Sequence, residues 1–120
     1  MTGENTRACG ARKEAQAAEY LTAHGVKILC KNFRCRQGEI DLIGQDGDCL
    51  VFFEVKYRSG DRYADPLSAV GIMKQRKICR VADYYRLVER VPSDTQIRYD
   101  VIGIRREETA WIKNAFPHRY

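Results

Sequence analysis

The chain has 120 residues, of which 44% are apolar and 31% charged, and it carries a formal net charge of +5. This length suits one domain with a single hydrophobic core. No apolar run approaches the roughly 20 residues of a membrane-spanning helix, so we expect no membrane partner. The net positive charge favours an anionic partner, and nucleic acid is the first candidate. Residues 1–12 lack the apolar core of a secretory signal, which predicts a cytoplasmic protein.

Five cysteines are scattered along the chain without a Cys-x-x-Cys pair. Reduced, mostly buried thiols in the cytosol are the simplest interpretation. A zinc site built from Cys30, Cys35 and a histidine is the weaker alternative. His24 is interpreted as a helix-end residue, and His118 as part of a C-terminal tail.

The N-terminal part of the chain predicts a tail and a helix. Residues 1–9 are interpreted as a flexible polar tail, which leaves 10–120 as a single domain. An alanine-rich helix is predicted from about Gly10 to His24, because Gly25 is well suited to the position just past a helix end. Its expected apolar stripe consists of Ala15, Ala18 and Leu21. A first strand is predicted over residues 26–33.

Residues 38–58 predict a β-hairpin, because two alternating runs flank an Asp-Gly pair. With Asp46 and Gly47 as the central turn residues, Glu39 would lie opposite Glu54, and Asp41 would share a face with Glu54 and Lys56. A loop one residue longer would turn Asp41 to the other face. The grouping of these side chains therefore depends on the turn.

The rest of the chain predicts a loop, two helical segments and two more strands. The expected ranges are a loop over 59–65, a short helical turn over 67–70, a helix over 72–90, and strands over 96–104 and 110–116. The element order is thus helix, three strands, helix, two strands. This order favours an α/β fold with a mixed sheet of about five strands and helices against its faces.

Charged residues interrupt two strands that are otherwise apolar. A Glu-x-Lys pair is usually a solvated edge, but Glu54 and Lys56 lie among apolar residues typical of a buried central strand. Asp41 and Glu39 interrupt the neighbouring strand in the same way. A divalent cation would relieve the repulsion of these carboxylates, and Mg²⁺ or Mn²⁺ prefers such oxygen ligands. Lys56 would then orient a water nucleophile or stabilise developing charge at a phosphate.

Basic residues recur along the second long helix and the first hairpin. A solvated helix face is the ordinary interpretation, and a surface that follows a phosphate backbone is the alternative. The cations concerned are Lys74, Arg76, Lys77, Arg80, Arg86 and Arg90, extended by Lys31, Arg34, Arg36, Arg58 and Arg62. Among them, Arg34, Arg36, Arg58, Lys77 and Arg80 are our candidates for nucleic-acid contacts.

Several sequence blocks together resemble the YraN-like family of bacterial proteins. They are Asn-Phe-Arg-Cys-Arg at 32–36, Gly-Glu-Ile-Asp-Leu-Ile at 38–43, Phe-Phe-Glu-Val-Lys at 52–56 with Arg58, Ala-Val at 69–70 and Lys-Gln-Arg at 74–76. The resemblance extends from about residue 10 to residue 116. This family is grouped with Holliday-junction resolvases and the PD-(D/E)xK nuclease superfamily.

The resemblance implies a restriction-endonuclease-like three-layer fold and a metal-dependent endonuclease acting on DNA, with branched DNA as one substrate. It implies that Asp41, Glu54 and Lys56 form the catalytic triad and that Glu14 completes the metal site, with Mg²⁺ or Mn²⁺ as cofactor. Glu39, Lys74 and Gln75 would support the site. A two-fold homodimer would suit symmetric cutting of two strands.

Two positions depart from the family pattern. Lys13 stands where glycine is common, and pairing of Lys13 with Glu14 would weaken a metal site. Tyr63-Ala64 stands where an aromatic residue followed by glycine is common. The alternative function is a non-catalytic nucleic-acid-binding protein that retains the fold and its basic surface, and a third is a structural factor that binds no nucleic acid.

Overall fold

The computed structural model describes residues 2–57 and 70–120, and only the backbone of residues 2–11. Within these ranges the elements follow the predicted order of helix, three strands, helix and two strands. They are α1 (Thr2–Ala23), β1 (Lys27–Cys35), β2 (Gly38–Asp46), β3 (Cys49–Tyr57), α2 (Ile72–Val88), β4 (Gln96–Arg105) and β5 (Glu108–Phe116). Neither of these helices is long and apolar enough to cross a membrane.

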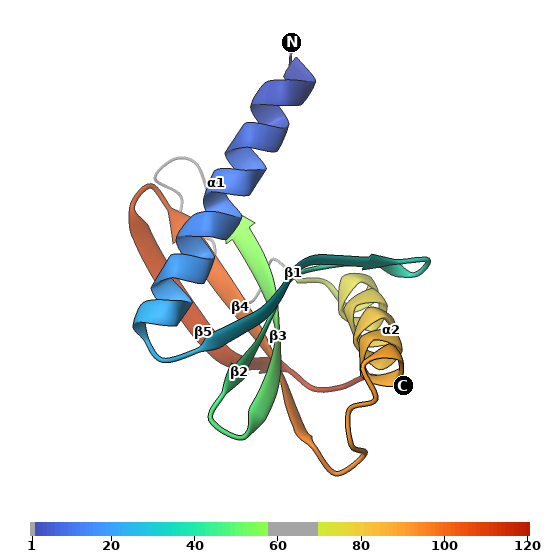
Figure 1. Ribbon diagram of the computed structural model, residues 1–120. Helices are drawn as coiled ribbons and strands as arrows, with labels where there is room; N and C mark the ends of the chain where they lie inside the picture. The colour runs from blue at the N-terminus through green and yellow to red at the C-terminus, as the bar shows by residue number, and fades with distance from the viewer. Residues whose placement is uncertain (1, 58–69) are drawn as a thin grey trace.

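The strands form one mixed sheet in the order β1-β2-β3-β4-β5. Neighbouring strands are antiparallel except β3 and β4, which are parallel and are connected through α2. A parallel pair needs a long crossover, which the helix provides. Figure 1 shows α1 and α2 against the sheet. The predicted three-layer α/β fold with a mixed five-stranded sheet is confirmed.

The sheet has a hydrophobic core on each face, because neighbouring residues of a strand point to opposite sides. Phe52 packs with Ala82 and other apolar residues of α2. Phe53 packs on the other face with Leu21 and neighbouring residues of α1. Since β3 is apolar on both faces, it is a central strand, as the sequence predicted.

The first helix differs from the prediction in its start and in its buried face. It begins at Thr2, so the predicted tail over residues 1–9 is wrong from Thr2 onward. This segment contains no proline, and extending an existing helix adds one hydrogen bond for each residue fixed. Ala17, Ala18 and Leu21 are buried, whereas Ala15 is exposed.

The hairpin between β2 and β3 has a different register from the predicted one. Asp46 pairs with Cys49, so Gly47 and Asp48 are the central turn residues instead of Asp46 and Gly47. Only Gly47 has a positive φ (61°), which is typical of a type II′ turn with glycine first. The register has moved by two residues, which preserves the side of the sheet to which the side chains of the paired residues 42–46 point.

Some predicted features fall outside the described residues. These are the loop over 59–65, most of the helical turn over 67–70, and the side chains of Arg58, Arg62, Tyr63 and Ala64. Val70 is described and is buried beside the start of α2.

Candidate active site

The candidate site lies where β2 and β3 separate. Their pairing runs from Asp46 to Leu42, which pairs with Phe53. Beyond that pair, Val55 donates its backbone N–H to Asp41 Oδ2 at 2.8 Å. A side-chain carboxylate thus binds a backbone donor of the neighbouring strand where the regular pairing ends. This contact fixes the Asp41 carboxylate beside Glu54.

Three carboxylates come together at this end of the sheet. Oxygen atoms of Glu14, Glu39 and Asp41 all lie within 4.8 Å of one another. Glu14 comes from α1, so the cluster joins a helix to β2. Glu39 does not lie opposite Glu54, because the register differs. Instead it is exposed and pairs with Arg34 at 3.4 Å.

Glu54 contributes a fourth carboxylate, which two lysines neutralise. Its side chain is 8% exposed, and Oε1 lies 2.6 Å from Lys74 Nζ and 3.8 Å from Lys56 Nζ. Burial alone would lower the pKa of Lys74, but the hydrogen bond and negative charge of Glu54 outweigh it and raise that pKa. Lys56 and Lys74, which the sequence predicted for this site, therefore both lie beside Glu54, and Lys74 is the closer of the two to its carboxylate.

Burial and neighbouring charge raise the pKa of Asp41 to about 7. Burial is the largest cause, because it penalises the charged form, and the negative charge of Glu54 adds to it. Glu14 and Glu39 raise the pKa further, while the hydrogen bond from Val55 lowers it. A carboxyl group with such a pKa changes its charge near neutral pH.

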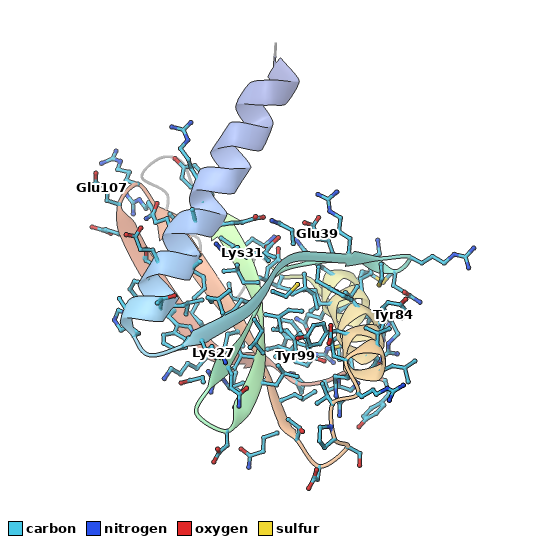
Figure 2. All side chains as sticks on the ribbon, viewed as in Figure 1. Lys27, Lys31, Glu39, Tyr84, Tyr99 and Glu107 are labelled. Atoms are coloured by element: carbon cyan, nitrogen blue, oxygen red, sulfur yellow. The ribbon has the colours of Figure 1, made fainter. Side chains whose placement is uncertain are left out.

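A cavity of about 240 Å³ opens beside these groups. Its lining residues are Gly38, Glu39, Asp41, Glu54, Lys74, Lys77 and Ile78. In Figure 2, Glu39 lies beside the ribbon of β1 and β2, between the two helices in that view. Sequence reasoning missed Gly38 and Ile78. Gly38 has a φ of 148°, and a Cβ there would lie 3.5 Å from a methyl group of Val81.

The donor set at this site fits a hard divalent cation. Mg²⁺ and Mn²⁺ favour carboxylate oxygens, which Glu14, Glu39 and Asp41 supply together. The ammonium of Lys13, the residue before Glu14, lies 3.8 Å from the ring centroid of Tyr57. Among the residues whose side chains the structure describes, this is the only such cluster, so Cys30 and Cys35 belong to none.

The predicted nucleic-acid contacts are divided between the site and other parts of the molecule. Lys77 lines the cavity, and Arg34 and Arg36 are exposed on the first hairpin. Arg80 lies within 3.1 Å of Asp83 and donates a hydrogen bond to the carbonyl of Arg119.

Gln75 holds the start of α2 instead of lining the cavity. Its Nε2 donates to the carbonyl of Val70 at 2.9 Å, and its Oε1 accepts from Arg119 Nε at 2.6 Å. The C-terminal segment is thereby bound to the helix that carries Lys74. No local pattern in the sequence signals the contact between Gln75 and Arg119, because the two residues are 44 positions apart.

Comparison with known proteins gives a consistent family. The sequence profile described as uncharacterised protein family UPF0102 matches residues 13–104. A UPF0102 protein of Lachnoclostridium phytofermentans is 46% identical over 112 residues, covering 93% of this chain and 95% of the relative. UPF0102 proteins of Methylococcus capsulatus and Marinobacter nauticus are 40% and 42% identical, and each alignment covers at least 95% of both chains. The chain therefore belongs to the UPF0102 family.

Proposed function

We propose that this protein is a metal-dependent nuclease that hydrolyses phosphodiester bonds in DNA. The observation that carries the proposal is the carboxylate cluster of Glu14, Glu39 and Asp41 beside the lysine-bound Glu54. Such a set combines ligands for a hard cation with positive charge for a phosphate. The resemblance to PD-(D/E)xK nucleases supports the same assignment of Asp41, Glu54 and Lys56.

Each side chain has a defined task in this proposal. Asp41, Glu14 and Glu54 would hold Mg²⁺ or Mn²⁺, and Glu39 would support them. When bound, the ion would polarise the scissile phosphate and acidify a water molecule. Asp41 must first lose its proton, which its pKa of about 7 allows near neutral pH.

The two lysines complete the proposed chemistry. Lys56 would orient the attacking water or stabilise the charge that develops on the phosphate. Lys74 neutralises Glu54, at 2.6 Å, and its ammonium lies at the wall of the cavity. Positive charge on this wall also favours entry of an anionic backbone.

The test is cleavage of a DNA panel that contains a duplex, a single strand and a four-way junction, with Mg²⁺ or Mn²⁺ present. We expect Asp41→Asn and Glu54→Gln to abolish cleavage while retaining the fold. Asp48→Asn, an exposed turn residue, is the matched control and should cleave like the wild type. Full activity in both site variants would show that cleavage does not come from this site.

Metal binding is tested separately from cleavage. Calorimetric titration of Mn²⁺ should show binding to the wild-type protein and none to Asp41→Asn. Binding of equal strength to both proteins would exclude Asp41 as a ligand.

The alternative is a nucleic-acid-binding protein without catalysis. One observation favours this alternative: the Lys74 ammonium lies 2.6 Å from the Glu54 carboxylate. The ammonium of Lys74 then occupies the position at Glu54 that a metal ion would take. DNA binding that weakens steeply with salt, without cleavage in either metal, would support this alternative.

A further inference from the structure

The first hairpin continues past the rest of the sheet as a two-stranded arm. Pairing of β1 with β2 extends to Cys35 and Gly38, whereas pairing of β2 with β3 ends at Leu42. Gly38 lies four positions before Leu42, which corresponds to about 14 Å of strand. We call residues 33–40 the arm. Figure 1 shows that it passes α2 and that its turn lies beyond that helix.

One face of the arm is fixed on α2. The ring of Phe33 makes an edge contact with Tyr85, with centroids 5.2 Å apart, and a tilted contact with Tyr84 at 6.2 Å. Cys35 also packs against the core beneath α2. The arm is therefore held in one orientation relative to the candidate site, whose lining includes two residues of the arm, Gly38 next to the turn and Glu39.

The other face of the arm is polar and mainly basic. Arg34 pairs across the arm with Glu39, and the side chain of Arg34 remains 74% exposed. Arg36 is exposed in the turn, and Lys31 is exposed where the arm begins. Figure 2 shows Lys31 and Glu39 near the same stretch of ribbon. Two cations, Arg34 and Arg36, thus stand against one carboxylate, Glu39, on a narrow, anchored projection, and Lys31 lies just before it.

The shape and charge of the arm fit the major groove of B-form DNA. That groove is about 12 Å wide and admits a two-stranded β-ribbon, whereas the major groove of A-form RNA is too narrow for side chains to read. Arginine is also the side chain best suited to bidentate contacts with guanine or phosphate. A single strand offers no groove for an arm of this kind.

We propose that the arm enters the major groove of duplex DNA and makes B-form duplex the substrate class of this protein. Arg36 at the turn contacts base edges or phosphates, and the arm places the neighbouring backbone at the carboxylate cluster. This inference rests on the proposed function, because it takes DNA as the partner of the same site.

The test measures binding without cleavage. Fluorescence anisotropy in EDTA compares a duplex DNA, one of its strands and a duplex RNA of the same sequence. We expect the duplex DNA to bind most tightly. Arg36→Ala should weaken its binding by about 5-fold to 150-fold if the contact is to a base, or lower the slope of log affinity against log salt by about 0.9 if it is to a phosphate.

Two further variants separate the arm from general charge. Lys113→Ala removes an exposed cation from β5, at the opposite edge of the sheet, and should leave duplex affinity nearly unchanged. Arg36→Lys keeps the positive charge but loses the planar guanidinium group. Compared with Arg36→Ala, it should bring the salt slope closer to the wild-type value than it brings the affinity. Thermal unfolding of each variant verifies that the fold is retained.

The outcomes distinguish this inference from the proposed function. Equal binding of single-stranded and duplex DNA, or wild-type affinity and salt slope in Arg36→Ala, would overturn the role of the arm and leave the nuclease proposal standing. Absence of binding to every probe at low salt would overturn both.

Discussion

The pKa of Asp41 predicts that this carboxylate destabilises the metal-free protein above neutral pH. The pKa is raised from 3.8 to about 7 in the folded state. Because one pH unit corresponds to about 1.4 kcal/mol, the charged form of Asp41 costs the folded protein at most about 4 kcal/mol. Asp41→Asn removes this charge and keeps an oxygen that can accept the Val55 N–H.

The direction of the pH dependence follows from proton binding. Between about pH 4 and pH 7 the folded protein keeps the proton of Asp41 while the unfolded chain has lost it, so this group lowers the free energy of unfolding as the pH rises. Above about pH 7 both states have lost the proton, and the contribution becomes constant. At low pH the wild type and Asp41→Asn should therefore have similar stability.

Urea unfolding in EDTA, repeated from about pH 4 to about pH 8, measures this difference directly. Subtracting the wild-type curve from that of Asp41→Asn cancels the groups that titrate equally in both proteins. The variant should become progressively more stable than the wild type, by up to about 4 kcal/mol at the highest pH. A difference that does not change with pH, or a variant that is less stable at pH 8, would refute the reasoning.

Three further substitutions test the packing and polar contacts around the sheet. Asp100→Asn should lower the free energy of unfolding, measured in urea, by about 3 kcal/mol. Asp100 is fully buried, and the substitution removes the negative charge that Arg98 contacts at two points, each at 2.8 Å. Gly44→Ala should cost about 1–3 kcal/mol, since a Cβ there would lie 2.8 Å from a valine methyl and 3.0 Å from a backbone oxygen; an unchanged melting temperature would contradict this. Tyr99→Phe removes the contact of 2.6 Å between the hydroxyl and His118 Nδ1, and should cost about 1 kcal/mol in thermal unfolding.

The sequence predicted the fold well because its strongest signals are periodic. The predicted strand over 96–104 lies within β4, and its alternating residues pack into the two cores, Tyr99 and Val101 into one and Ile102 into the other. Alternation carries no information on a register shift of two residues, which leaves every side chain on the same face. The turn at Gly47 decided that register, and two adjacent positions for a two-residue turn were compatible with the sequence.

The candidate site could be predicted in part. Asp41 is beside Glu54 as the sequence predicted, but it is held there by the backbone N–H of Val55, beyond the end of the regular pairing, a contact that strand alternation does not specify. The position of Glu39 depended on the register itself, and its pairing with Arg34 was missed. Lys74 approaches Glu54 through the packing of α2 on the sheet, a contact between residues 20 positions apart that no local pattern specifies.

The hydrogen bond between Asp41 and Val55 gives this protein an internal spectroscopic reporter. The backbone N–H of Val55 donates to the Asp41 carboxylate with an N···O distance of 2.8 Å, so the chemical shift of this amide proton follows the charge on that group. In a ¹⁵N-labelled sample, one backbone resonance would then record both the titration of Asp41 and the arrival of a diamagnetic cation such as Mg²⁺. The state of the site becomes readable without a substrate, a product or any assay of turnover.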